Sequence, residues 1–599
     1  MTQIYHKKAC CWFYKSGSGS NQAGGCTKEF LDNHNGDVSL VMGPAGQPKQ
    51  NANADAINDF NTETAQLTAS GLDTNVLAGL VARINNSFCE VVSVGLDTVG
   101  IDQWAGKSEY IWTDTNETNS IIYPDDDSIY SVGGYIHIKG TNGQLADGTY
   151  EILSMEYGGL EIDDGMAVFD NDWGYLYCAP ESMSGVNIVI GGAYNDLQDV
   201  LNIPDAVYHD QWIFFNEEIA PSVLVNGSAY YIYSSHDGEA ANNTKLYIVG
   251  YNTYAYDCLP DGYGYFPEGT QNVSTHYKTA LERAKNPSDT SIKADLPTAT
   301  TKNITDNWGR IFRVYTSAEN VQFMGIYFEV AVYHWPIMAD NETTGSVFVK
   351  HCAGGHISYD AAPAFYGGQI VRVNDAATGG GIFDSFFKGV EMFNGTTPTV
   401  DSSGDWEFAY NVGIYTSNIN PDYSGPVVHH NIFVKSNWGV SAVARSFQNV
   451  FNNIFYLCRQ AGLHLNGTEA RMRAWNNIIV MDETSGIFDG LFRISAGGTV
   501  DYLDYNCYCN QNGQPVSIFA FDTEANPSFN FDNLKKGPHD IEADPMFMDP
   551  DNWDFRLREN SPCIGMGRPD LQGNPATIGP YLEKQTVGLY GKTKSLYGI

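Results

Sequence analysis

The sequence predicts an all-β protein whose main body is a parallel β-helix, a solenoid of short strands stacked coil upon coil. Two observations lead to this fold class, and the first is composition. The chain holds 61 Gly, 37 Tyr and 30 Phe but only 33 Lys and Arg together in 599 residues. Many short strands joined by tight turns produce that profile, whereas helical bundles are rich in Ala, Leu, Glu and Lys.

The second observation is a repeat in which an Asn precedes a short apolar strand. Its copies read YNVGIY, HNIFVK, NNIFYL, NNIIVM and YNCYCN, with their Asn residues 20, 22, 24 and 29 positions apart. These residues are Asn411, Asn431, Asn453, Asn477 and Asn506. One strand per period of this length indicates a solenoid, because each unit buries its apolar face only by stacking on its neighbours.

The recurring Asn predicts a structural ladder of side chains. An amide both donates and accepts, so amides stacked from coil to coil hydrogen-bond along the axis. Asn also tolerates the left-handed backbone conformation, and we expect the ladder residues to adopt it.

The N-terminal third is predicted to differ from the solenoid. Residues 1–52 are rich in Gly, Ser and Asn without periodicity, so we expect an irregular N-terminal arm. Residues 53–186 are predicted to form a docking region with a small β-barrel or meander at about 90–180. Within it, 133–163 contains three short strands with alternating apolar residues.

Ordered segments flank the repeat at both ends. Residues 191–219 (GGAYNDLQDVLNIPDAVYHDQWIFFNEEI) precede the first copy. Residues 539–567 (HDIEADPMFMDPDNWDFRLRENSPCIGMG) follow the last copy. At about 24 residues per coil, roughly 380 residues would give about 15 coils.

These two segments and the Asn repeat resemble the right-handed parallel β-helix repeat proteins of the pectate-lyase-like superfamily, of the kind found in phage virion proteins. The resemblance covers about 190–583. It implies a right-handed single-stranded parallel β-helix over 187–583, entered at 191–219 through a short capping helix and a strand. Residues 584–599 are assigned to a C-terminal tail.

Many members of this superfamily cleave acidic polysaccharides, so the resemblance makes an enzyme an alternative. The clustered Asp and G-H-G motifs of the polygalacturonases and the R-x-P-x-x-R motif of the pectate lyases are missing from the sequence. Their absence favours a protein that binds over one that catalyses.

Charge and cysteine usage exclude several classes of partner. A net charge of −37 disfavours nucleic acid and anionic membrane, since like charges repel. The 11 cysteines lack any CxxC pair, which indicates mostly free thiols made in a reducing compartment. The first 20 residues contain no apolar stretch typical of a secretion signal, so we expect release by lysis, as for virion proteins.

Two charged pairs are the candidate catalytic residues. Asp405 and Glu407 are spaced i, i+2, which on a strand places both on one face at about 6.5–7 Å, a separation suited to an acid and a base. Arg471 and Arg473 have the same spacing. Glu407 and Arg473 both stand four residues before a ladder Asn, so we expect one column with about 14 Å between them. Solvated outer-face charges are the competing interpretation of both pairs.

Aromatic residues on or beside the coils are the candidate glycan-binding residues, since exposed indoles stack on sugar rings; packing beneath loops is the alternative. They are Trp335, Trp406, Trp438 and Trp475.

No metal site is predicted. Cys507 and Cys509 occupy apolar repeat positions and are expected to pack in the core. His429 and His430 are neighbours on a strand and should point to opposite faces. The acidic segment at 549–554 lacks the Gly of a calcium loop, so we expect no cofactor, with calcium as the alternative.

The leading hypothesis is a virion-surface structural protein: a head fibre, decoration protein or tail spike. It would dock on capsid or tail proteins through residues 1–186 and display the β-helix for host attachment or glycan binding. A homo-oligomer fits this role. The alternative is a polysaccharide lyase or glycoside hydrolase that acts on surface or extracellular polysaccharide.

Overall fold

The computed structural model describes residues between 9 and 580 with gaps. The longer gaps are 59–63, 69–75, 103–107, 124–131, 140–147, 164–170, 180–185, 202–209, 220–227, 234–244, 259–299, 303–308, 340–345, 357–368, 397–404 and 523–535, with shorter ones elsewhere. The predicted tail at 584–599 therefore lies outside the described residues.

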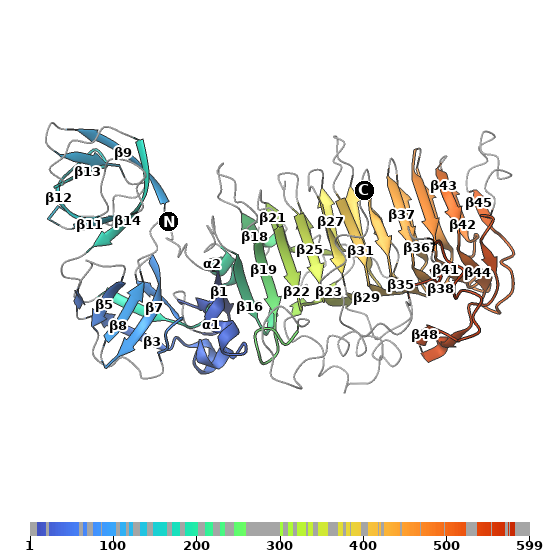
Figure 1. Ribbon diagram of the computed structural model, residues 1–599, viewed down its shortest axis with the longest axis horizontal. Coiled ribbons are helices and arrows are strands. Elements are labelled where there is room, and N and C mark those ends of the chain that lie inside the picture. Colours follow the sequence, from blue (N-terminus) through green and yellow to red (C-terminus); the bar gives the residue numbers. More distant parts are fainter. Residues whose placement is uncertain are drawn as a thin grey trace.

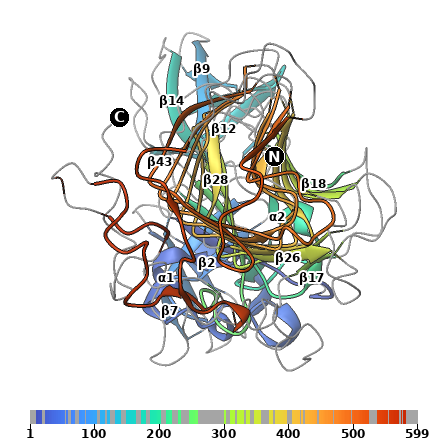
Figure 2. The same ribbon diagram turned by 90° about the vertical axis from the view of Figure 1, so that its right-hand side faces the viewer.

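The main body is a parallel β-helix with three sheets running along its length (Figure 1). Each coil contributes one strand to each sheet in turn, and equivalent strands of successive coils pair in parallel. The fold class predicted from the sequence is confirmed. Viewed along its axis, the strands surround a common centre (Figure 2).

The first sheet has 12 strands, all parallel except β2, which pairs antiparallel with β1. In sheet order they are β2 (Cys26–Thr27), β1 (Cys10–Tyr14), β16 (Gln211–Phe215), β19 (Lys245–Gly250), β22 (Asn320–Met324), β25 (Ser346–Lys350), β28 (Gly379–Phe383), β31 (Asp405–Ala409), β34 (Val427–His429), β37 (Phe447–Phe451), β40 (Arg471–Trp475) and β43 (Thr499–Asp504).

The second sheet has 11 strands. They are β17 (Glu218–Ile219), β20 (Thr300–Lys302), β23 (Tyr327–Val330), β26 (Ala353–His356), β29 (Phe386–Lys388), β32 (Val412–Ile414), β35 (Ile432–Val434), β38 (Ile454–Cys458), β41 (Ile478–Met481), β44 (Cys507–Asn510) and β46 (Ile541–Glu542).

The third sheet is built in two consecutive parts. The first part holds β18 (Ser228–Tyr233), β21 (Gly309–Tyr315), β24 (His334–Ala339), β27 (Gln369–Asn374), β30 (Glu391–Thr396) and β33 (Ile419–Asn420). The second part holds β36 (Trp438–Val443), β39 (Ala461–Asn466), β42 (Phe492–Ser495) and β45 (Ala520–Asp522).

The predicted Asn ladder is confirmed at the turn between the first and second sheets. Each ladder Nδ2 donates to the Oδ1 of the ladder Asn in the next coil at 3.0 Å, from Asn411 through to Asn506. All these side chains are fully buried. Ser385 begins the row by donating its backbone N–H to Asn411 Oδ1, and Asp540 ends it by accepting from Asn506.

The expectation that the ladder Asn itself is left-handed is wrong. The positive φ belongs to the residue before it, because there the chain turns out of the first sheet before the amide enters the ladder. These residues are Tyr410, His430, Asn452, Asn476 and Tyr505, with φ of 62, 55, 55, 55 and 58°.

Residues after the ladder Asn alternate between two cores. The second residue points inward, as Phe433 and Phe455 show by stacking with ring centroids 5.2 Å apart. The first and third residues pack on the outer face of the second sheet, under the C-terminal exit segment that carries Phe547 and Phe555. That segment forms a hairpin of β47 (Phe547–Asp549) and β48 (Asp554–Leu557), with a 3-10 turn at Pro550–Asn552 between them.

Cys507 and Cys509 are buried in this second core, as predicted. Across the described part of the chain, ten cysteines are buried and unpaired in disulfides.

The N-terminal arm departs from expectation. Strand β1 within it pairs in parallel with β16 and forms the first coil of the solenoid. Its sequence, CCWFY, is buried along its whole length, and the Gly-rich and Ser-rich composition around it hides this short apolar run. Helix α2 (Leu197–Leu201) buries its apolar side chains beside Trp12 and Tyr14 and caps this end of the core, as the capping segment predicts.

Two modules are inserted between the first two coils. Helix α1 (Lys28–Asn33) and 3-10 turns at Val38–Leu40 and Pro44–Gly46 precede a 7-stranded sheet. Its strands are β3 (Gln50–Ala54), β15 (Val186–Ile190), β6 (Val81–Ile84), β7 (Ser87–Gly95), β8 (Thr98–Asp102), β5 (Thr64–Thr68) and β4 (Ala56–Asn58).

The predicted barrel is inserted in turn between β8 and β15 of this sheet. It is closed by β10 (Ser120–Ile122), β13 (Gly159–Ile162), β12 (Gly148–Glu156), β11 (Tyr135–Lys139), β14 (Asn171–Ala179) and β9 (Ser108–Thr115). Its core contains Ile136, Ile138, Ile152, Leu160 and Ile162, the alternating positions read from the sequence.

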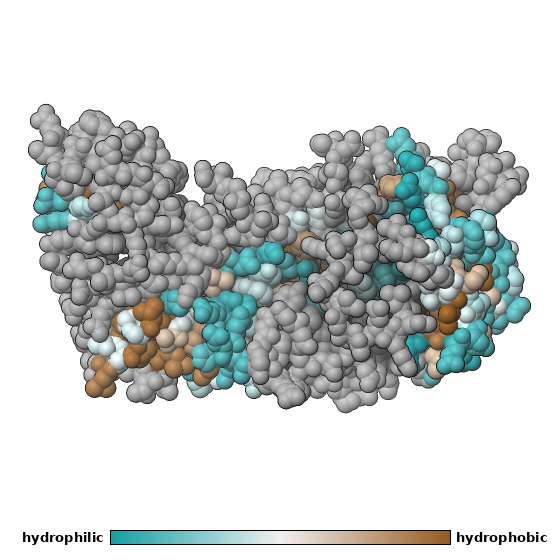
Figure 3. Space-filling model, in the orientation of Figure 1, coloured by the Kyte–Doolittle hydropathy of each residue, from teal (hydrophilic) through white to brown (hydrophobic). Residues whose placement is uncertain are grey.

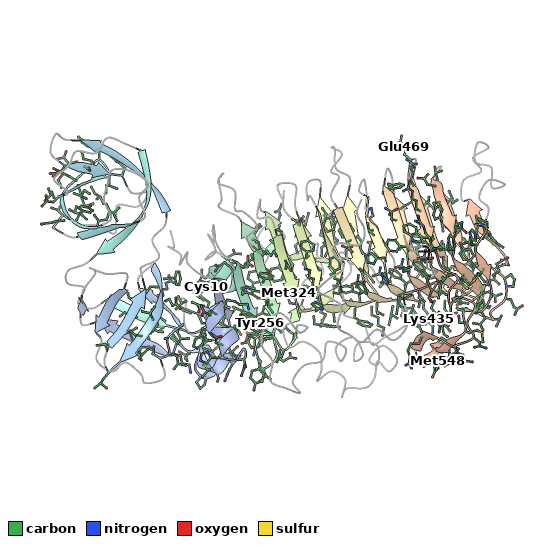
Figure 4. The ribbon with its side chains drawn as sticks, in the orientation of Figure 1. Cys10, Tyr256, Met324, Lys435, Glu469 and Met548 are labelled. Carbon is green, nitrogen blue, oxygen red and sulfur yellow. The ribbon has the colours of Figure 1, made fainter. Side chains whose placement is uncertain are left out.

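The inserted modules lie at the first-coil end of the solenoid, and Cys10 marks the junction (Figure 4). Leu96 at the β7–β8 turn is exposed. Apolar atoms gather around the 7-stranded sheet, at the lower left of the molecule (Figure 3). Among the described residues, the first sheet has fewer strands than the 15 coils expected from length, because some successive strands, such as β19 and β22, lie much more than 24 residues apart. No helix in the described ranges has the length and apolar character needed to cross a membrane.

Candidate glycan-binding surface

The candidate site lies on the outer face of the first sheet, over strands β31 to β43. The pairings place Glu407, Val427, Asn449, Arg473 and Tyr502 in one outward column, one residue per coil. Three strand steps separate Glu407 from Arg473, or about 14 Å. The column expected from the ladder spacing is therefore present.

Glu407 ends a chain of hydrogen-bonded side chains. Its Oε1 lies 2.7 Å from His429 Nε2, and His429 Nδ1 lies 2.7 Å from His430 Nδ1. His430 Nε2 lies 3.2 Å from Asn452 Nδ2. The Glu407 side chain is half exposed, whereas that of His429 is only 12 % exposed, so the row runs from solvent inward.

The contact between the two histidines corrects the expectation that they point to opposite faces. That expectation assumed a regular strand through both residues. His430 instead has a φ of +55°, because it is the left-handed residue before a ladder Asn. The altered backbone turns its ring back toward His429.

The hydrogen bonds set the direction of the protons. An exposed carboxylate is ionised at neutral pH and only accepts, so His429 Nε2 donates to Glu407. His429 Nδ1 then accepts from His430 Nδ1, and His430 Nε2 accepts from the Asn452 amide. His430 carries its single proton on Nδ1 and is neutral in this arrangement. Burial, and secondarily the neighbouring His429, lowers the pKa of His430 to about 3, which agrees with a neutral ring.

The arginine pair lies at the other end of the surface. Arg471 makes a two-point contact with Asp501, with Nη2–Oδ2 of 2.7 Å and Nε–Oδ1 of 3.1 Å. Both guanidinium groups lie over the Phe447 ring, at 5.4 Å for Arg471 and 4.8 Å for Arg473. Arg473 is exposed, and within the described ranges it has no ion-pair partner. Asp501 thus balances one of the two positive charges.

A stack of rings borders the charged column. His429, Phe451 and Trp475 lie nearly parallel on consecutive coils, with centroid distances of 5.0 and 4.6 Å. The guanidinium of Arg568 lies 5.3 Å from the Trp475 centroid. Ring faces that contact each other present their edges outward, so a sugar at Trp475 would meet the ring edge. This stack stiffens the surface beside the column.

Trp406 does not lie on the surface. It is 4 % exposed and packs against Phe393 and Phe408 in the central core. The glycan-binding role predicted for Trp406 is wrong for this reason. The i, i+2 spacing that places Asp405 and Glu407 on the outward face places Trp406, which lies between them, on the opposite face.

The remaining predicted residues are placed as follows. Trp335 and Trp438 lie on the third sheet, away from this surface. Trp335 is only 5 % exposed, so the glycan-binding role predicted for it is wrong for the same reason as for Trp406. Asp405 begins β31 opposite Gly379, and its side chain lies outside the described residues. The sequence did not reveal the roles of Asn452 or of the joined histidines. The signal that could have found them is the position before each ladder Asn, where a changed backbone redirects the side chain.

No group of three or more His, Cys, Asp or Glu residues in the described part of the chain is placed to hold a metal ion. The calcium alternative remains untested. On this surface, Arg473 can pair with an anion and Glu407 can accept hydrogen bonds.

Comparison with known proteins adds little to this picture. No protein-family model matches the sequence, and no curated protein matches it. The catalytic unit of a thermostable GH87 alpha-1,3-glucanase from Streptomyces thermodiastaticus aligns with 80% of this chain and 85% of its own, at 8% identity and a TM-score of 0.24. The Agl-KA catalytic domain aligns with 79% of this chain and 97% of its own, at 10% identity and a TM-score of 0.21.

A further solved structure is a GH87 alpha-1,3-glucanase catalytic domain in complex with nigerose, at 8% identity and a TM-score of 0.23. Scores this low establish no shared site. The β-helix itself rests on the strand pairings described above.

Proposed function

We propose that this protein is a glycan-binding β-helix protein that holds an extended acidic polysaccharide along the outer face of its first sheet. The observation that carries this proposal is the column from Glu407 to Arg473, exposed at both ends and parallel to the solenoid axis. A polymer with a regular repeat fits a surface with a regular repeat.

The net charge of −37 repels an acidic polymer at long range, so binding depends on short-range pairing with local cations on the first sheet. Arg473 supplies a cation without an ion-pair partner in the described ranges, and it would pair with a carboxylate or sulfate on the ligand. Glu407 would accept hydrogen bonds from sugar hydroxyl groups. Half-buried Val427 and Asn449 lie between them, so a flat chain could approach the sheet closely.

Binding of an oligouronate, measured by calorimetry, tests the proposal. Arg473→Ala should weaken binding at least fivefold, and added salt should weaken wild-type binding as charges are screened. Lys435→Ala is the matched control, because Lys435 is an exposed cation on the turn after β35, outside the column (Figure 4). Equal affinity of wild type and Arg473→Ala would reject the proposed surface.

Hydrolysis or lyase chemistry is the second candidate, and the Glu407–His429–His430 chain favours it. Such a chain can position a general base and buffer its proton. Glycoside hydrolysis ordinarily uses two carboxylates, and the second would have to be Asp405. If a polysaccharide gained new reducing or unsaturated ends with the wild type but not with Glu407→Gln, catalysis would be established. If neither protein produced such ends, only the binding function would stand.

Virion location, docking through residues 1–186 and oligomerisation stay predictions from the sequence. Cryo-electron microscopy of the native particle or secretion would decide among them. Density for the N-terminal modules on a capsid or tail is the outcome that these predictions require.

A further inference from the structure

The outer face of the third sheet carries a second cluster of polar residues, near the last coils. Ser441, His464 and Arg493 occupy one register column on β36, β39 and β42. Ser441 and His464 are 1 % and 4 % exposed, whereas Arg493 and Asp489 keep about a fifth of their side-chain surface. The cluster therefore has a buried floor and a more open rim.

Some polar groups of the cluster are paired. Ser441 Oγ lies 3.1 Å from His464 Nδ1. Gln460 Nε2 donates to Asp489 Oδ2 at 2.8 Å, and Arg493 forms an ion pair with the same carboxylate oxygen. Burial, followed by the neighbouring Arg493, lowers the pKa of His464 to about 4, so its ring is neutral at pH 7.

Three other polar atoms in the cluster are buried and have no hydrogen-bond partner among the residues described. They are Trp438 Nε1, His464 Nε2 and Arg493 Nε. The first and third can only donate. Folded proteins rarely bury a donor without a partner, and clustered exceptions indicate an unseen water or ligand.

An indole ring stands beside these atoms. The Trp438 ring is half buried, 4.9 Å from the His464 ring and 5.9 Å from the Arg493 guanidinium. Such an arrangement suits a sugar ring: its apolar C–H groups can pack on the indole, and its hydroxyl groups can hydrogen-bond to the unpaired donors and the carboxylate.

The same residue types recur earlier on the third sheet. At Trp335, the Arg372 guanidinium lies 4.1 Å from the ring, and Gln369 Nε2 donates to Glu391 Oε2 at 2.7 Å. Arg372 Nε and Gln369 Oε1 are also buried without a partner within the described ranges. The two constellations share the residue types Trp, Arg, Gln and a carboxylate, but the Trp335 ring is buried whereas the Trp438 ring is partly exposed.

We propose that the cluster of Trp438, Ser441, His464, Asp489 and Arg493 is a binding site for an uncharged sugar unit. The ion pair leaves the cluster without net charge, so it has no excess cation to favour an acidic ligand, unlike Arg473 on the first sheet. Trp438 Nε1 and Arg493 Nε donate to sugar oxygens, and Asp489 accepts from a hydroxyl group. The site uses a different sheet from the surface proposed above and does not depend on it.

Calorimetric titration of the full chain with neutral gluco-, galacto- and manno-oligosaccharides tests the inference. Trp438→Phe keeps a ring but removes the indole N–H, and it should weaken binding of the neutral ligand at least fivefold. Trp475→Phe is the matched control, since it changes an indole on the first sheet. Arg473→Ala should leave neutral binding unchanged, which separates this site from the acidic-glycan surface.

Unaltered binding by Trp438→Phe, or no binding of any neutral oligosaccharide by a folded wild type, would overturn the inference. A denaturation midpoint matched to wild type shows that Trp438→Phe is folded. A ligand-soaked structure with only ordered water at the three unpartnered atoms would overturn it as well.

Discussion

Replacing Asn453 with Ala tests the stabilising role of the ladder at its centre. Asn453 Oδ1 accepts from the backbone N–H and the Nδ2 of Asn431, each at 3.0 Å. Its Nδ2 donates to the carbonyls of Val428 and Phe451 at 2.9 and 3.0 Å, and to Asn477 Oδ1 at 3.0 Å. The side chain is fully buried, so water cannot replace these partners.

The expected loss follows from the groups left behind. The backbone N–H of Asn431 loses its acceptor, which costs about 1–3 kcal/mol for one buried unsatisfied donor. The weakened carbonyl contacts and a small void add a comparable amount, so we expect a loss of about 2–5 kcal/mol in the free energy of unfolding. Asn477 Oδ1 keeps one donor, the backbone N–H of residue 453, so the unsatisfied ladder groups are confined to the Asn431 side of the substitution.

Urea denaturation followed by circular dichroism measures the effect. Asn466→Ala is the matched control, because Asn466 ends β39 with an exposed side chain and should change stability by no more than about 0.5 kcal/mol. If Asn453→Ala lost no more stability than Asn466→Ala, the ladder would be a consequence of the fold and would not stabilise it.

Three further predictions use the same measurement. Asp540→Ala should destabilise the last coil by about 1–3 kcal/mol because it removes the acceptor of Asn506. Asp540→Asn should cost less, since burial raises the pKa of this carboxyl and disfavours its charged form. The folded pKa of His430 is about 3, below the unfolded value near 6.5. Its contribution to the free energy of unfolding should therefore be constant above pH 6.5 and fall with acid between the two values, by at most about 1.4 kcal/mol per pH unit. His430→Phe should reduce this loss of stability between pH 6.5 and 3. Phe455→Ala should cost about 3–5 kcal/mol by opening a void beside Phe433, and a cost below 1 kcal/mol would refute that packing.

The parts of the fold with a repeat or an alternating pattern could be predicted. Asn411 to Asn506 predicted both the ladder and the strand after each amide, because stacking coils demands the same residue at the same place. Ile136 and Ile138 predicted a barrel strand for the corresponding reason of alternation.

The rest depended on contacts between distant segments. Strand β1 joins the solenoid by pairing with β16, about 200 residues away, and five apolar residues alone do not identify a partner. Trp406 and Glu407 differ in burial although they are adjacent, because one-residue changes in register reverse the face of a strand. The joining of His429 to His430 depended on a single left-handed residue that the strand pattern does not show.

A structure of the full chain bound to an acidic oligosaccharide tests the central claim most directly. The proposed function predicts ligand density along the outer face of the first sheet, with an acidic group at Arg473 and a hydroxyl group at Glu407. Ligand density confined to another face, with the column from Glu407 to Arg473 bare, would contradict it.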